Sequence, residues 1–573
     1  MPDEGACAGL FRRFRPVRPA GRRAAGKSGE PFGEAPLARS IAFGADLANF
    51  HPSREVSSVC AEKDRHDTAA ELTGRITAGP DELLRREVLR PQLDFEAEHL
   101  LPGYLRLEQV LLLEYHRMGL LGTADVAAIA SVLSELDSSV VRELADAAMS
   151  DIAFTIERYV TDRIGGAAHA WHVDRSRNDL QATAQTIYGR DRVLSTVDEL
   201  IGLGRAAHRL AGREIDTLMP GYTHSQPAQV ASAGFYFSAL SAQVLHSLHR
   251  FDMVYASVDA SPMGAGAMTG GELDWDRTRM ARLLGFSSGD GHALIGVAAR
   301  DWALEATAEL CLLGVPLSRF VTDLLTWSGA GYGFIDLPDE FSGISSAMPQ
   351  KKNFPVLERL RGRTAQLAAG FMGVVLGQRA TPFSNTIEVS KEAGRHVPLA
   401  FDQASSVLRL FTAVLDALRL RTERLRDVCT TEYLGGFSLA NGLCLNAGVP
   451  WRTAQVIAGR YIVAAVDKGL SPAEPDAGLL RQVAEERGFA VSGAEQLLTR
   501  AFDVDKALSA KRTTGSAGQD SVRTMLDQQA AAFDLAERRW ATRRARITEA
   551  YAETDRLLKA LTEASTHLPE ASA

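Results

Sequence analysis

Cysteines are few in this sequence, and their spacing suggests no pairs. Five cysteines are scattered over 573 residues without a CxxC motif, which argues against a disulfide framework and a structural zinc site. A reducing, cytoplasmic location is therefore expected. The 13 histidines are also dispersed, apart from His169 and His172, so no metal site is expected.

Long apolar runs and a basic excess are lacking as well. The best candidate for a membrane span, 367–376, is too short to cross a bilayer and is interpreted as part of a buried helix. The 63 basic and 71 acidic residues give a formal net charge of -8, which does not favour nucleic-acid binding. Neither a membrane nor a nucleic acid is expected as a partner.

Strand patterns are sparse, whereas the helical period recurs along most of the chain. It is clear in 231–254, 303–325 and 406–418, where apolar residues recur every three to four positions. Since 46% of the residues are hydrophobic, the chain can bury a large core. The sequence predicts an all-α fold built on a bundle of long helices.

Residues 1–70 differ from the rest, because they are basic, rich in Pro and Gly, and without periodicity. A disordered extension, an organelle-targeting presequence and residues upstream of the true translation start are the alternatives. Disorder is favoured by the composition. Order is expected to begin near residue 71.

Residues 341–353 form the stretch with the most chemistry, Phe-Ser-Gly-Ile-Ser-Ser-Ala-Met-Pro-Gln-Lys-Lys-Asn. Its Pro and small residues predict an exposed loop, which leads into a helix that carries Glu358. A hydroxyl close to ammonium groups can have its pKa lowered until it works as a base. The alternative, favoured by Ser-Ser or Lys-Lys alone, is a basic surface loop.

A second stretch places Arg175, Ser176, Arg177 and Asn178 next to one another. Two arginines with polar neighbours make a plausible carboxylate-binding turn. The alternative is a helix N-terminus with solvated charges.

A third stretch, Pro-Gly-Tyr-Thr-His, places Thr223 and His224 on a turn before a long apolar helix. A histidine there can act as a general acid near neutral pH, and a threonine can bind a carboxylate oxygen. A structural histidine is the alternative.

These three stretches together resemble the argininosuccinate lyase branch of the fumarase/aspartase superfamily. In that branch the second reads His-Thr-Gly-Arg-Ser-Arg-Asn-Asp and the third Gly-Tyr-Thr-His-Leu-Gln, and the first is similar to its signature loop. A C-terminal run at 512–518 resembles the family's Arg-Thr-Ser-x-Gly-Gly-Thr, so the resemblance covers roughly residues 70 to 530. The Gly-rich stretch 262–271 contains GxGxxxG but follows no predicted strand, so a dinucleotide site is disfavoured; the family has a similar loop, which implies a role in backbone shape.

The resemblance implies a fold, an assembly and a reaction. It implies a central long-helix bundle (175–421) between a smaller N-terminal helical domain (71–174) and a C-terminal helical domain and tail (422–573). The assembly would be a homotetramer in which different subunits complete each active site. The reaction would release fumarate from an N-succinyl-type small molecule without a metal or organic cofactor.

The resemblance also implies roles for single residues. Ser345 would be the base, Lys351 and Asn353 would stabilise the charge that develops on a carboxylate, and His224, supported by Glu358, would be the general acid. The residues implied at the substrate are Arg175, Ser176, Arg177, Asn178, Thr223, Phe383, Glu388 and Lys391.

Four departures from the family pattern lie at the substrate end. Phe383 and Glu388 stand where the family has Tyr and Gln, Ala153 where it has His, and Val-Asp at 173–174 where it has Thr-Gly. Losing a hydrogen-bond partner in a buried site costs about 1–3 kcal/mol. Three hypotheses stay open: argininosuccinate lyase, a lyase for another N-succinyl amine, and an inactive structural protein. Dehydration of malate is less favoured.

Overall fold

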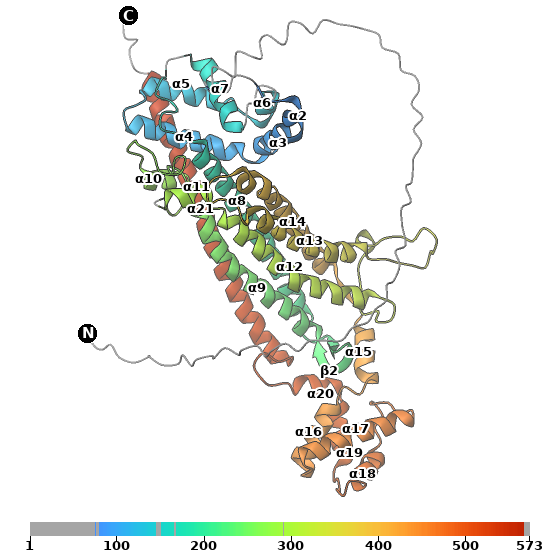
Figure 1. Ribbon diagram of the computed structural model, residues 1–573. Coiled ribbons are helices and arrows are strands. Elements are labelled where there is room, and N and C mark those ends of the chain that lie inside the picture. Colours follow the sequence, from blue (N-terminus) through green and yellow to red (C-terminus); the bar gives the residue numbers. More distant parts are fainter. Residues whose placement is uncertain (1–74, 76–78, 145–150, 166–167, 290, 567–573) are drawn as a thin grey trace, which may run out of the picture.

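The computed structural model describes residues 75, 79–144, 151–165, 168–289 and 291–566 (Figure 1). The basic extension expected at 1–70 lies outside them. The first group of helices comprises α2 (Glu82–Leu84), π-helix η1 (Arg85–Leu89), α3 (Arg90–His99), α4 (Leu101–Arg117), α5 (Thr123–Leu133), α6 (Ser138–Glu143) and α7 (Ile152–Ile164).

The middle of the chain forms the long elements. They are α8 (Arg177–Arg213), β1 (Leu218–Thr223), β2 (Gln226–Ser232), α9 (Ala233–Val258), α10 (Arg277–Leu283), α11 (Ala293–Ala298), α12 (Asp301–Ser328), β3 (Ile335–Asp336), 3-10 helix η3 (Asp339–Phe341), α13 (Pro355–Gln378), π-helix η4 (Glu388–Ala393), α14 (His396–Ala417) and β4 (Arg419–Leu420). The final group is α15 (Thr422–Thr431), α16 (Gly436–Ala447), α17 (Trp451–Asp467), α18 (Ala477–Glu485), α19 (Ala494–Phe502), α20 (Val504–Ser509) and α21 (Gln519–Thr566).

The bundle is formed by α8, α9, α12, α13 and α14, which pack side by side along their lengths (Figure 1). The all-α, long-helix fold expected from the sequence is confirmed. Helix α8 has 37 residues, so at 1.5 Å per residue it spans roughly 55 Å. It begins where the hydroxyl of Ser176 accepts the N–H of Asn178 at 3.1 Å, an N-cap.

A smaller helical layer covers each end of the bundle (Figure 1). At one end, α3 to α7 share a core with the first turns of α8, through Leu180, Ala184 and Ile187. At the other, α16 to α19 enclose a core of their own, built on residues such as Leu443, Ile457 and Leu480. The bundle thus separates two small domains.

Helix α21 does not stay with the C-terminal domain, although the tail was expected in one range with it, 422–573. Its 48 residues form one helix that returns along α8 and α9 to α4 and α5 (Figure 1). Phe533 and Trp540 lie in the central core. A Cβ on Gly204 would lie 2.4 Å from Phe533 Cζ, so the glycine provides the space for this ring. An amphipathic helix was expected in this tail, but the surface that its apolar side covers was not.

In the described part of the chain, the helix that could cross a membrane by length and composition is α12, and not the run 367–376 that was the best candidate in the sequence. Within the described residues it is the one helix long and apolar enough to cross a membrane, with a mean hydropathy of 1.3 over its best window. It packs against α9, α13 and α14, and Leu310, Leu313 and Leu317 are buried there. We interpret α12 as a core helix of the bundle.

Candidate active site

Asn178 lies in the first turn of α8, where three segments meet. Its Nδ2 donates to the carbonyl of Ala267 at 3.0 Å, in the Gly-rich loop. Its Oδ1 accepts from Nδ2 of Asn385 at 3.0 Å, in the segment that leads into η4. The amide is thus held from both sides.

The Gly-rich loop is anchored by the next residue, Asp179. Its Oδ2 accepts the N–H groups of Gly264 and Gly266, each at 3.0 Å. Both glycines have positive φ, +82° and +61°, which favours residues without a Cβ. Burial raises the pKa of Asp179 to about 6, although the two N–H groups lower it. In this chain the loop therefore shapes the start of α8.

The two arginines of this stretch have acidic partners within the chain. The side chain of Arg175 is 3% exposed, and its guanidinium forms a two-pronged ion pair with Glu108 of α4. Arg177, 46% exposed, pairs with Asp151 at 2.8 Å and lies over the ring of Phe154. The enclosure of Arg175 gives no support to its expected role at a substrate carboxylate.

Asp174, one of the departures from the family pattern, is hydrogen-bonded to the segment 272–275. Its Oδ2 accepts the N–H groups of Glu272 and Leu273 at 2.8 Å and the indole N–H of Trp275 at 2.9 Å. Burial alone would raise its pKa, but these donors, with Leu273 the strongest, hold the pKa below its ordinary value. The added negative charge thus anchors a loop. Ala153, another departure, is buried in α7.

The segment around η4 contributes three residues of the expected substrate set, and they point in different directions. Phe383 is 64% exposed and Glu388 is exposed at the start of η4. Lys391 turns inward, and its Nζ forms an ion pair with Glu96 of α3, which is 1% exposed. Sequence reasoning missed Glu96, because no local pattern links two residues 295 positions apart.

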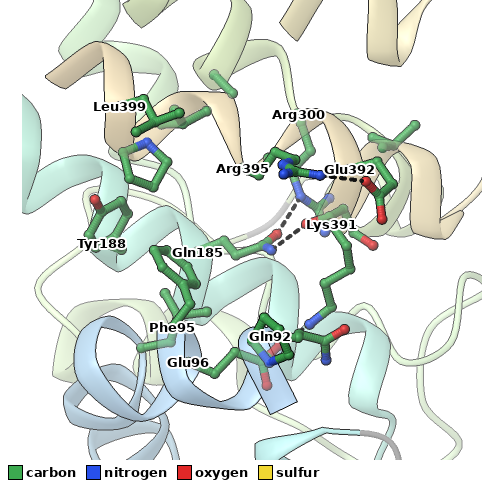
Figure 2. Close-up of a pocket in the computed structure, with 18 of the residues that line it drawn as sticks. Gln92, Phe95, Glu96, Gln185, Tyr188, Arg300, Lys391, Glu392, Arg395 and Leu399 are labelled. Atoms are coloured by element: carbon green, nitrogen blue, oxygen red, sulfur yellow. Dashed lines mark hydrogen bonds and ion pairs between the residues drawn. The ribbon is translucent and has the colours of Figure 1, made fainter. Parts of the chain in front are cut away.

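This ion pair lies in the wall of a cavity of about 420 Å³ between α3, α8, the start of α12 and the η4–α14 junction (Figure 2). Figure 2 shows Gln185 between Arg300 on one side and the rings of Phe95 and Tyr188 on the other. The volume falls in the usual range for small-molecule pockets, roughly 300–1,000 Å³. Carbon atoms make up most of the lining.

The hairpin β1–β2 carries Thr223 and His224 at the opposite end of α8. Thr223 pairs with Gln226, so His224 and Ser225 form a two-residue turn, with φ of +53° and +60°. Thr223, His224 and Ser225 are all exposed. About one length of α8, roughly 55 Å, therefore separates His224 from Asn178.

The loop 341–353 projects from the bundle between α12 and α13 (Figure 1). Its neck is closed by two backbone hydrogen bonds between Gly343 and Asn353, of 2.9 and 3.1 Å. Inside the loop, the hydroxyl of Ser345 accepts the N–H of Met348 at 3.0 Å. The loop is largely exposed and leads into α13, as the sequence predicted.

The two lysines of the loop differ in their surroundings. Nζ of Lys352 lies 3.2 Å from Asp336 and 3.1 Å from Asp339, so this lysine fastens the loop to the bundle. Lys351 is exposed and has no ion-pair partner in the described part of the chain. Its ammonium group is available for a ligand.

One chain does not bring the expected catalytic groups together. Glu358 is exposed in the first turn of α13, and no hydrogen bond joins it to His224 among the residues that the structure describes. Asn178 and Lys391 lie at one end of the bundle, and His224 lies at the other. Contact between these groups requires more than one copy of the chain.

Comparison with known proteins identifies the class of protein to which this chain belongs. Residues 109–368 match the family model described as Lyase. The chain is 31% identical over 441 residues to argininosuccinate lyase of Methanothrix thermoacetophila, covering 77% of this chain and 89% of that protein. It is 30% identical over 384 residues to argininosuccinate lyase of Methanothermobacter thermautotrophicus, covering 67% and 82%.

The chain belongs to the argininosuccinate lyase branch of the fumarase/aspartase superfamily. Solved structures agree on the fold. An EDDS lyase variant with bound fumarate is similar with a TM-score of 0.76 at 23% identity, covering 88% of this chain and all 100% of that one. A class II fumarase from Schistosoma mansoni is similar with a TM-score of 0.57 at 15% identity, covering 74% and 93%.

Proposed function

We propose that this lyase breaks a carbon–nitrogen bond and releases fumarate from an N-succinyl compound, with argininosuccinate as the first candidate. The observation that carries the proposal is the state of the loop 341–353. Its neck is closed and Ser345 is held inside it. Lys351 has no ion-pair partner among the described residues, while Lys352 is neutralised by two aspartates. The curated relatives named argininosuccinate lyase support the same reaction.

The proposed chemistry uses side chains alone. Deprotonated Ser345 removes a proton from the succinyl carbon next to a carboxylate, and the electron pair moves onto that carboxylate. Lys351 and Asn353 stabilise the doubly charged carboxylate. The electron pair then returns from the carboxylate to form the carbon–carbon double bond, the carbon–nitrogen bond breaks, and its electron pair leaves with the nitrogen. Protonated His224 donates a proton to that nitrogen. The products are fumarate and a free amine or guanidine.

The proposed enzyme is a homotetramer whose subunits share their active sites. The separation of roughly 55 Å between Asn178 and His224 along α8 supports this, because no single chain can place both on one small substrate. Exposed apolar side chains on the bundle also support it: Met253 on α9 is 72% exposed, Val315 on α12 57% and Leu376 on α13 61%. Burial of these side chains against another subunit would remove apolar surface from water, which favours association.

A second candidate substrate is another N-succinyl amine. The observation that favours it is the ion pair between Lys391 and Glu96, which occupies the lysine expected at the polar end of the substrate. Phe383, without a hydroxyl, is exposed beside this segment. A leaving group with fewer charged atoms than arginine fits these two features.

The test is fumarate release, followed by ultraviolet absorbance, from purified protein given argininosuccinate. Ser345→Ala and Lys351→Met are expected to abolish release. Their neighbours provide matched controls: Ser346→Ala should leave activity intact, and Lys352→Met should affect mainly the stability of the loop. Equal loss in Ser345→Ala and Ser346→Ala would contradict the assignment of the base.

No release by a folded wild-type oligomer would exclude argininosuccinate. The substrate can then be identified through the reverse reaction, because the enzyme consumes fumarate when the correct amine is supplied. Arginine and agmatine, which differ by one carboxylate, form the first pair of amines to compare. An oligomer that neither releases nor consumes fumarate would point to the inactive structural protein.

A further inference from the structure

We propose that Arg300 is a positioning residue that orients the amide of Asn178, so that its N–H groups rather than its carbonyl face the substrate. The inference rests on the proposed function, in which Asn178 binds a carboxylate of the N-succinyl substrate. Two hydrogen bonds in series carry it, from Arg300 to Asn385 and from Asn385 to Asn178.

Arg300 is a buried cation that has only neutral partners. It is 4% exposed. Its Nε donates to Gln185 Oε1 at 2.9 Å, its Nη1 to the carbonyls of Val297 and Ala299 at 2.9 and 2.8 Å, and its Nη2 to Asn385 Oδ1 at 3.3 Å. Among the described residues, no carboxylate forms an ion pair with it.

A buried guanidinium without a counter-charge lowers the stability of the folded protein. Burial lowers the pKa of Arg300 to about 10, which still leaves it protonated at neutral pH. An uncompensated buried charge destabilises a protein unless another interaction offsets it. An anionic substrate bound nearby supplies the missing negative charge, and a dicarboxylate is such a substrate.

The donor properties of Arg300 fix the direction of the whole chain of bonds. A guanidinium donates and never accepts, so Asn385 must turn its Oδ1 toward Arg300. Its Nδ2 then faces Asn178, whose Oδ1 must accept. At the far end, the carbonyl of Ala267 accepts from Asn178 Nδ2 at 3.0 Å, which independently requires the same orientation. An amide can be placed in two orientations, and both Arg300 and the carbonyl of Ala267 require the same one.

The orientation matters because a carboxylate only accepts hydrogen bonds. Asn178 Nδ2 carries two N–H groups, and within the described residues Ala267 takes one of them. The second remains for a substrate oxygen. Hydrogen bonds in series polarise one another, so the charge of Arg300 also strengthens this donor.

Asn385→Asp tests the inference with the full-length oligomer. The new carboxylate can still accept from Arg300 and pairs its charge, so thermal stability should be unchanged or higher. It cannot donate to Asn178, and as a charged acceptor it attracts the N–H groups of that amide more strongly than the neutral carbonyl of Ala267 does. The amide of Asn178 then turns over and presents its carbonyl. Fumarate is the probe, because it is common to every candidate substrate. Its affinity, measured by NMR titration, is expected to fall about tenfold or more.

Two further variants separate orientation from charge. Ser384→Asp adds the same charge one residue away but leaves both bonds of the series in place, so it should weaken fumarate binding much less. Asn385→Ala removes the series without adding charge and should weaken binding to an intermediate degree. Fumarate binding by Asn385→Asp equal to that of the wild type would overturn the inference alone. No fumarate binding by the wild type would overturn the proposed function and the inference together.

Discussion

Lys391 of η4 and Glu96 of α3 form an ion pair that is almost fully buried, with side chains 13% and 1% exposed. A second oxygen of Glu96 accepts the N–H of Ile152 at 3.1 Å. Burial raises the pKa of Glu96 even though the ammonium of Lys391 lowers it. One carboxylate therefore ties the N-terminal domain to the bundle at the wall of the cavity.

Removing one partner of this pair should destabilise the protein strongly. Glu96→Ala leaves a buried ammonium without a counter-charge, which typically costs about 3–5 kcal/mol. Chemical denaturation of the oligomer at fixed protein concentration measures the change. Asp505→Ala is the control, because its pair with Arg426 has side chains 64% and 52% exposed and should be worth at most about 1 kcal/mol. Similar losses in both variants would contradict the prediction.

Ser225→Gly should stabilise the hairpin that carries His224. Both turn residues have positive φ, which costs non-glycine residues about 1–2 kcal/mol. After the greater entropy loss of glycine on folding, a gain of about 0.5–1 kcal/mol is expected. Ser195→Gly, in the middle of α8, should have the opposite sign. Thermal unfolding compares the two, and a loss of stability in Ser225→Gly would show that the turn is not strained.

The stability of the protein should fall as the pH falls below about 6.5. Burial and the charge of Arg175 lower the pKa of His172 to about 2, in spite of Glu157 at 3.7 Å. The unfolded chain therefore binds a proton that the folded chain does not, between the unfolded pKa of about 6.5 and about 2. The contribution of neutral His172 to the free energy of unfolding is complete above pH 6.5. Below that pH it declines by up to about 1.4 kcal/mol per pH unit.

His172→Asn checks that prediction, since asparagine tolerates the positive φ of +80° at this position. Unfolding curves between pH 7 and pH 4.5 should lose stability less steeply in the variant than in the wild type. Identical slopes would assign the acid sensitivity to other groups.

Two inactive variants should restore each other's activity when their subunits mix. Asn178→Ala and His224→Ala change opposite ends of α8, so some sites in a mixed oligomer receive both intact stretches. Co-expression with two affinity tags and an assay of the doubly tagged species measures this. Ser345→Ala mixed with Lys351→Met should stay inactive, because both residues lie in one loop. Equal results for the two mixtures would contradict shared sites.

Local and periodic features of this protein were predictable from its sequence. The long helices follow from apolar residues repeated every three to four positions, which any helix must bury on one side. The loop 341–353 and the turn at Thr223 and His224 follow from Pro, Gly and small polar residues, which act within a few positions of themselves. The family resemblance rests on the same short stretches.

Only the tertiary structure decided the partners of the buried charges. Glu96 meets Lys391, Arg300 meets Asn385, and Asp174 caps the loop that holds Trp275. The sequence could not indicate these pairs, because a charged residue looks the same whether it faces water or a distant partner. The return of α21 along the bundle was not predictable either. Its few apolar residues, Phe533 and Trp540 among them, are buried by α8 and α9, which lie far away in the sequence.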